Sequence, residues 1–263
     1  MSSLSVPGAV IDFDLSGEDT TGPAVVQLHG LTSSRARDRV LGLDLGRAFP
    51  GRLLRYDARG HGRSTGRPVP GDYLWERLAE DLLTLLDHIF PGEPVHGVGP
   101  SMGTGTLLHA ASREPGRFLG LTLVVPPTVW DSRRAQAGTY DNQAALVEAQ
   151  GVGALVALGR DVLPPPAAPP APPTEPDVAE ELLPSLLRGA ALTDLPSAQV
   201  VARVAVPTHI LAWHDDPTHP LSTATALHEL LPGSTLRVAS TAQEVAGWPE
   251  LLSEQVLATA GSS

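Results

Sequence analysis

Short apolar runs alternate with longer stretches of helical spacing along most of this chain. Five of the runs lack a strict alternation of buried and exposed positions, which is typical of parallel strands covered on both faces. They are residues 24–28, 53–56, 95–98, 121–125 and 208–212, and a run at 235–239 predicts a last strand. Helical stretches lie between the runs, so the order predicts an α/β fold with a mostly parallel sheet and right-handed crossovers.

The clearest helical pattern covers residues 72–89, where leucines and an isoleucine recur at intervals of three and four. That spacing places the apolar side chains on one face of a helix. A second helix is predicted to start at or near Ser101 and to carry Leu107 and Leu108. Further helical patterns cover residues 144–158, 178–187 and 223–231.

The alternation breaks between residues 126 and 196. Within this stretch, residues 164–176 (PPPAAPPAPPTEP) hold eight of the 26 prolines. Proline lacks a backbone N–H and fixes φ, so we expect an extended, partly mobile strap rather than a helix or an internal strand. We interpret residues 126–196 as a cap inserted into one core domain, formed by residues 1–125 and 197–263. A linker between two domains is the alternative.

The sequence Gly99-Pro100-Ser101-Met102-Gly103 stands between a predicted strand and a predicted helix. The pattern G-x-S-x-G alone is short, but this context is the one in which it forms a nucleophile elbow. A sharp turn there would hold the Ser101 hydroxyl above the sheet, at the positive end of the helix. The alternative is a tight turn with an N-capping serine.

Two further segments follow predicted strands: residues 29–32 (HGLT) and residues 56–64 (YDARGHGRS). The HG loop, the YDARGHGRS turn and the GPSMG elbow, in this order and spacing, resemble the α/β-hydrolase family over nearly the whole chain. The resemblance implies an eight-stranded sheet with a helical cap after the sixth strand, which agrees with an insertion at 126–196.

The resemblance also implies an oxyanion hole. The backbone N–H groups of Leu31 and Met102 are expected to point at one developing oxyanion. His29 and Gly30 are expected beside the substrate. The turn that contains His61 is expected to lie below the site, with this histidine in a structural role.

A closer similarity concerns the start of the cap. Residues 124–133 (VVPPTVWDSR), followed by a helix near Gly151, are somewhat similar to 3-oxoadipate enol-lactonases and related small-lactone hydrolases. Trp130 is then a candidate substrate-binding residue, and Arg133 and Arg134 could receive an anionic group of the substrate. A solvated helix start is the alternative for all three.

The acid of the expected triad falls in the sequence after the strand at 208–212. The family places it just after this strand and shortly before a proline. Asp216, four residues before Pro220, fits best, and Asp215 is the second candidate. A carboxylate here would orient an imidazole and stabilise its cation. An Asx turn or a cap of the following helix is the alternative.

The general base is missing from its usual place. The family histidine should follow the strand at 235–239, but residues 240–245 are STAQEV and the last histidine of the chain is His228. Serine is a poor nucleophile without a base, and losing the histidine of a working triad costs about a million-fold in turnover. His219 is the best substitute, His29 the next, and Glu244 a weaker one because an ordinary carboxylate is a weak base.

The composition limits the classes of partner, cofactor and cellular location that we expect. The net charge of −11, from 29 acidic and 18 basic residues, argues against nucleic acid and anionic membranes as partners. The absence of cysteine excludes disulfides, thiolate metal sites and a cysteine nucleophile. No apolar run reaches the roughly 18 residues that span a bilayer, and the first residues lack a basic leader. We therefore expect a cytoplasmic protein without metal or cofactor; its oligomeric state is not indicated.

Two hypotheses of different classes follow. The first is a cofactor-free hydrolase of a small ester or lactone, with Ser101, Asp216 and His219 as catalytic residues. The second is a degenerate relative that binds a small molecule, or catalyses a non-hydrolytic step, without an acyl-enzyme. The empty position of the family histidine, between Ala242 and Glu244, separates them.

Overall fold

The computed structural model describes residues 2–160 and 162–260. Its centre is an eight-stranded sheet in the order β1-β2-β4-β3-β5-β6-β7-β8. The strands β3 to β8 are parallel to one another, whereas β2 pairs antiparallel with β1 on one side and with β4 on the other. The bounds are β1 Ser2–Val6, β2 Ala9–Ser16, β3 Ala24–Gln27, β4 Leu53–Tyr56, β5 Val95–Pro100, β6 Phe118–Val124, β7 Thr208–Trp213 and β8 Thr235–Ala239.

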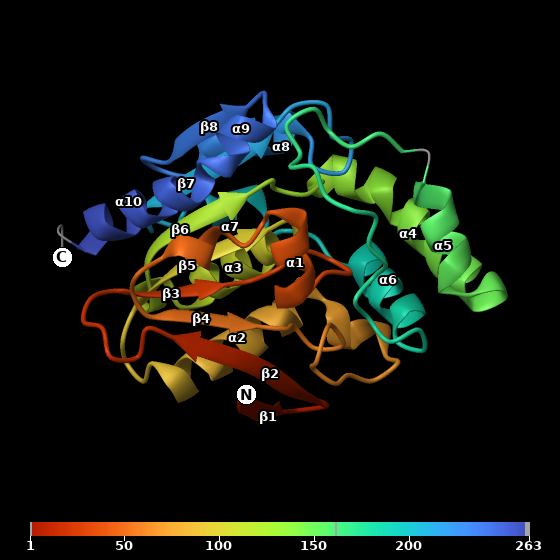
Figure 1. The fold of residues 1–263 in the computed structure, drawn as a ribbon, viewed down its shortest axis with the longest axis horizontal. Helices are drawn as coiled ribbons and strands as arrows, with labels where there is room; N and C mark the ends of the chain where they lie inside the picture. Colours follow the sequence, from red (N-terminus) through yellow and green to blue (C-terminus); the bar gives the residue numbers. More distant parts are fainter. Residues whose placement is uncertain (1, 161, 261–263) are drawn as a thin grey trace.

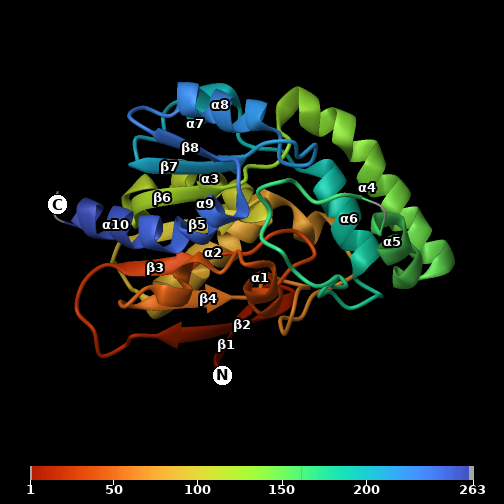
Figure 2. The same cartoon turned by 45° about the horizontal axis from the view of Figure 1, so that its top comes forward.

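Two layers of helices cover the sheet (Figures 1 and 2). The helices are α1 Arg35–Leu41, η1 Leu45–Ala48, η2 Pro70–Tyr73, α2 Trp75–Ile89, α3 Met102–Arg113, η3 Pro115–Arg117, α4 Trp130–Gln150, α5 Val152–Gly159, α6 Leu183–Leu192, α7 Ala198–Val201, α8 Leu221–Leu230, α9 Ala242–Ala246 and α10 Trp248–Ala260. Alternate residues of β3 explain why both faces need cover: Val26 packs into the cluster formed with α2, α3 and α8, and Val25 into the cluster formed with α10.

The segment between β6 and β7 forms a separate layer at the carboxyl ends of the parallel strands. There α4, α5 and α6 lie together (Figures 1 and 2). Residues of α4 and α6 share a small apolar cluster with Tyr73 of η2, and Leu31 packs against it from the loop after β3. That residues 126–196 form a cap on a core of residues 1–125 and 197–263 remains a prediction.

The proline-rich strap, residues 164–176, contains neither helix nor strand and is tied down on both sides. Ala167 is buried in the cluster that lies against α10. Near its other end, Arg37 of α1 donates to the Thr174 hydroxyl at 2.8 Å, and Ser34 donates to the Asp177 carboxylate at 2.5 Å. The strap therefore links the C-terminal part of the sheet to the helix that follows β3.

Several predicted elements have different bounds in the structure. The helix predicted over 72–89 is η2 followed by α2. The one predicted over 144–158 is divided at Gly151, whose φ of +79° interrupts the helical hydrogen bonds between α4 and α5. The one predicted over 178–187 begins later, at Leu183. The hairpin β1–β2 and the helices α1 and α10 were not predicted.

Candidate active site

Ser101 occupies the turn between β5 and α3. Its backbone has φ +51° and ψ −110°, a conformation that is costly for a residue with a side chain. The turn is possible because its neighbours are small: a Cβ on Gly99 would lie 2.8 Å from the Gly103 backbone, and a Cβ on Gly103 would lie 3.0 Å from Leu28. The elbow predicted from G-x-S-x-G therefore has a steric basis in this chain.

His219 lies against the Ser101 hydroxyl. Its Nε2 is 2.9 Å from Ser101 Oγ, and its Nδ1 is 2.7 Å from Asp216 Oδ2. Because an ionised carboxylate can only accept hydrogen bonds, Nδ1 carries the proton that it donates to Asp216. The lone pair of Nε2 then faces the hydroxyl and can accept its proton. The structure thus brings Ser101 together with His219, which lies 118 positions away in the sequence, and with Asp216, three positions from His219.

Four donors surround the Asp216 carboxylate. Oδ1 accepts the backbone N–H of Thr218 at 2.9 Å and that of His219 at 3.2 Å. Oδ2 accepts the indole Nε1–H of Trp213 at 2.9 Å in addition to the imidazole. Burial acts to raise the pKa of Asp216, but these hydrogen bonds and the charge of His219 outweigh it and lower the pKa to about 2. The acid is therefore ionised over the whole range in which a histidine can work as a base.

The loop that carries this pair is held from two sides. Trp213, the last residue of β7, reaches Asp216 from the sheet. Thr128, between β6 and α4, donates its backbone N–H to Thr218 O at 3.1 Å. Asp215, the second candidate for the acid, has φ +58° and is exposed. The sequence contains no signal that Trp213 and Thr128 hold this loop, because their contacts with it are tertiary.

The loop after β3 runs beside the elbow. A Cβ on Gly30 would lie 3.8 Å from Ser101 Cβ, so this residue borders the nucleophile directly. Within the described residues, no backbone hydrogen bond of the loop uses the N–H of Leu31, and the N–H of Met102 is at the open first turn of α3. Asp177 donates its N–H to Thr32 O at 2.9 Å, which braces the loop against the strap.

His29 is engaged by the backbone. Its Nε2 accepts the Ala58 N–H at 2.9 Å, and its Nδ1 lies 2.8 Å from Gly30 O and donates to it. The ring is buried, which lowers its pKa. His61 packs edge-on against it at 4.9 Å between ring centroids, and burial lowers the pKa of His61 to about 3. Both ring nitrogens of His29 are thus hydrogen-bonded to backbone groups, one in the loop after β3 and one in the loop after β4. Neither nitrogen is available for proton transfer.

Glu244 is engaged in a helix cap. Its carboxylate accepts the backbone N–H of Ser240 at 2.6 Å and of Thr241 at 3.2 Å, and the Thr241 hydroxyl accepts the Glu244 N–H at 3.3 Å. This reciprocal arrangement is a capping box at the start of α9. A carboxylate used in this way has the role of a structural group rather than that of a base.

Trp130 begins α4 with φ +49°. Its N–H donates to Asp194 Oδ1 at 2.9 Å and its indole to Pro196 O at 3.1 Å, so its polar groups are bonded to the segment between α6 and α7. A part of Trp130 in binding the substrate remains a prediction. Arg133 is buried and donates to Thr193 O and Ala190 O, with its guanidinium over the rings of Trp75 and Tyr140. This guanidinium is part of the cap's interior.

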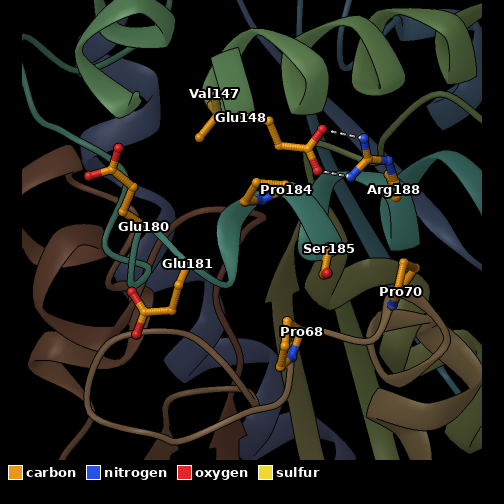
Figure 3. A pocket seen from close by; sticks show the side chains of 9 residues that line it. All are labelled: Pro68, Pro70, Val147, Glu148, Glu180, Glu181, Pro184, Ser185 and Arg188. Carbon is orange, nitrogen blue, oxygen red and sulfur yellow. Dashed lines mark hydrogen bonds and ion pairs between the residues drawn. The ribbon is translucent and has the colours of Figure 1, made fainter. Parts of the chain in front are cut away.

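Two pockets lie elsewhere on the molecule. The larger has a volume of about 770 Å³ and lies between α4, α6 and the segment before η2, where Glu148 pairs with Arg188 (Figure 3). The smaller, about 300 Å³, is lined by the ends of β7 and β8 and by Pro166 and Ala167 of the strap. Neither lining includes Ser101 or His219, and Ser101 itself is half-buried.

Comparison with known proteins identifies the class of this protein. Residues 23–157 match the family described as alpha/beta hydrolase fold, and the chain belongs to this family. It is 29% identical over 196 residues to 3-oxoadipate enol-lactonase 2 of Acinetobacter baylyi, a match that covers 71% of this chain and 69% of the relative.

Solved structures share the fold over nearly the whole chain. The enol-lactonase from Burkholderia xenovorans LB400 has a TM-score of 0.68 at 19% identity, with 98% of this chain and 99% of that chain covered. A thermophilic esterase from Thermogutta terrifontis has a TM-score of 0.70 at 19% identity, with 98% and 97% covered. In the described residues, no helix is long and apolar enough to cross a membrane.

Proposed function

We propose that this protein is a serine hydrolase of small carboxylic esters or lactones that works through an acyl-enzyme on Ser101. The observation that carries the proposal is the continuous chain of hydrogen bonds from Ser101 Oγ through His219 to Asp216, at 2.9 and 2.7 Å. These distances lie within the range in which a base can take a proton from its nucleophile.

In the acylation step, Ser101 Oγ attacks the carbonyl carbon while its proton moves to His219 Nε2. The imidazolium that forms is stabilised by the ionised Asp216. The tetrahedral intermediate then collapses, the bond to the alcohol oxygen breaks, and the Nε2 proton passes to that oxygen. For a lactone the alcohol remains attached to the acyl group.

In the deacylation step, water attacks the acyl carbon and gives a proton to His219, and Ser101 Oγ leaves with that proton. A negative charge develops on the carbonyl oxygen in each of the two steps. The N–H groups of Leu31 and Met102 are the proposed donors to it, since Gly30 brings the first beside the elbow and α3 begins with the second.

The substrate that suits the cap is uncharged in its acyl part. Arg133 is buried in contacts with backbone carbonyls of the cap, and Arg134 pairs with Asp131 at the surface. An anionic acyl group would need to displace these partners in order to bind either arginine. The relative 3-oxoadipate enol-lactonase 2, by contrast, is named for a lactone of an anionic acid. We infer that neutral esters and lactones are preferred to anionic ones.

The second hypothesis, a degenerate relative that binds a small molecule or catalyses a non-hydrolytic step without an acyl-enzyme, is based on the missing family histidine. The contact of His219 with Ser101 removes that reason and favours the hydrolase.

The test is covalent labelling with a fluorophosphonate together with turnover of p-nitrophenyl acetate. We expect wild type to be labelled, and Ser101→Ala to lose the label and at least about a thousand-fold of the turnover. Ser112→Ala is the matched control, because the hydroxyl of this serine of α3 donates to Leu108 O of its own helix. Turnover of Ser101→Ala equal to that of wild type contradicts the acyl-enzyme.

A further inference from the structure

A second side chain approaches the oxygen of Asp216 that His219 uses. Trp213 Nε1 lies 2.9 Å from Oδ2, and His219 Nδ1 lies 2.7 Å from the same atom. The donors to the other oxygen, the N–H groups of Thr218 and His219, belong to the loop itself. These two N–H groups stabilise the conformation of the loop. Because they belong to the loop, they do not fix its orientation relative to the sheet.

Trp213 is itself fixed. It ends β7, is 6% exposed, and belongs to the apolar cluster between the sheet and α10. Its ring stacks on that of Trp248, with 6.1 Å between centroids and 23° between planes. Trp248 starts α10 and is 2% exposed. An indole packed between a strand and a helix in this way has little room to change its side-chain rotamer, so the position of its N–H is fixed relative to the sheet.

We propose that Trp213 is the positioning residue of the acid–base pair, a role that rests on the proposed function of Ser101, Asp216 and His219. Its indole N–H ties the carboxylate of a largely exposed loop to the end of the sheet; the exposed residues of this loop are His214, Asp215, Pro217 and Thr218. The indole N–H of Trp213 thus fixes the carboxylate, and through it the imidazole of His219, relative to the end of β7.

The indole also shares the negative charge of Asp216 Oδ2 with the imidazole. A donor that is removed from an ionised acceptor leaves more charge for the remaining donor. Without the indole, the charge of Asp216 Oδ2 would act on the imidazole of His219 alone, and Asp216 would stabilise the imidazolium form more strongly. His219 is the titratable group in contact with Asp216, and His214 and Asp215 lie on the exposed part of the same loop.

The test compares Trp213→Phe with wild type. Phenylalanine keeps the stacked ring and removes the N–H. We expect the rate of fluorophosphonate labelling and kcat/KM for p-nitrophenyl acetate to fall about tenfold, and the acid limb of the kcat/KM profile to move to higher pH. The proton resonance of His219 Nδ1–H should change as well, and this readout needs no substrate.

Trp248→Phe is the matched control, because it alters the other ring of the same stack and touches no catalytic residue. We expect it to lower the melting temperature without moving the acid limb or the Nδ1–H resonance. If both variants change activity equally and neither moves the acid limb and the resonance, Trp213 only packs the core and the proposal is wrong. If wild type is neither labelled nor active while the resonance still responds to Trp213→Phe, the proposed hydrolysis fails and the positioning contact survives.

A second measurement covers failure of the phenylalanine variant to fold. In wild type, a hydrogen bond to an ionised carboxylate should place the indole Nε1–H resonance of Trp213 downfield, and Asp216→Asn should move it upfield. An unchanged indole resonance in Asp216→Asn overturns the proposal.

Discussion

The loops that follow β7 and β8 end at the same edge of the sheet but use their polar residues differently. After β7, the side chains of Asp216 and His219 point at each other and at Ser101. After β8, Thr241 and Glu244 satisfy each other's backbone in a capping box. The family resemblance places the base on the second loop, yet the geometry places an imidazole on the first. A base is defined by its reach to the nucleophile, and in this chain the loop after β7 supplies that reach.

The largest expected effect tests the first loop directly. His219→Ala removes the group that accepts the Ser101 proton, so turnover of p-nitrophenyl acetate should fall by about 10⁴- to 10⁶-fold. His214→Ala is the matched control, since this exposed histidine lies on the same loop, and we expect less than about a twofold change. Full activity of His219→Ala would show that the base lies elsewhere.

The same variant can be used to test the second loop. Gln243→His, added to His219→Ala, restores a histidine at the position between Ala242 and Glu244. Gln243 lies in α9 with an exposed side chain, so the new imidazole should not reach Ser101. We expect no recovery of turnover, and a recovery of tenfold or more would show that the two loops are interchangeable.

The next effect separates the two aspartates. Asp216→Asn removes the charge that holds the imidazole tautomer and stabilises its cation, so kcat should fall by about 10³- to 10⁴-fold. Asp215→Asn is the control: asparagine tolerates the positive φ of +58°, and the side chain is exposed. Equal losses in the two variants, measured by turnover and labelling rate, would contradict the assignment of the acid.

The environment of Asp216 also predicts a dependence of stability on pH. The pKa of the folded state, about 2, is below the ordinary value of 3.8, so the carboxylate stabilises the fold above pH 4 and loses that contribution as the pH falls through 2. The difference in free energy of unfolding between wild type and Asp216→Asn should therefore shrink from pH 5 to pH 2. Urea unfolding at a series of pH values measures it, and a difference that stays constant would contradict the shift.

The smallest effect concerns the capping box. Thr241→Ala removes the acceptor for the Glu244 N–H and should cost about 1 kcal/mol of stability. Since the box is separate from the triad, turnover should change by less than about twofold. Chemical denaturation and the p-nitrophenyl acetate assay measure the two quantities, and a large loss of turnover at full stability would give this loop a part in the chemistry.

Much of the fold was predictable because it depends on local pattern. The parallel strands are short apolar runs, and the strand predicted at 235–239 has those bounds in the structure. The hairpin β1–β2 was overlooked although β2 alternates buried and more exposed residues, with Ala9, Ile11 and Phe13 facing the core. α1 also had signals, a Ser34 N-cap and a left-handed Gly42 at its end.

The site was predictable in part. The elbow depends on glycines two positions from Ser101, which are local, so the sequence identified it. The base depends on how far His219 lies from Ser101, and a sequence contains no such distance. Contacts from Trp213 and Thr128 orient the loop, and these arise only once the strands and the cap have packed together. His219 was therefore one of several candidates, beside His29 and Glu244.

The spacing of three residues between Asp216 and His219 has a consequence for how the chain assembles this site. Joining two distant segments costs chain entropy that grows with the logarithm of the intervening length, whereas a contact between near neighbours costs little. Acid and imidazole can thus meet as soon as their own short turn forms, and only one long-range encounter, with Ser101, remains to be made. A histidine beyond β8 would require a second such encounter. During refolding, reactivity toward a fluorophosphonate should therefore return in a single phase, together with the docking of β7 beside β6.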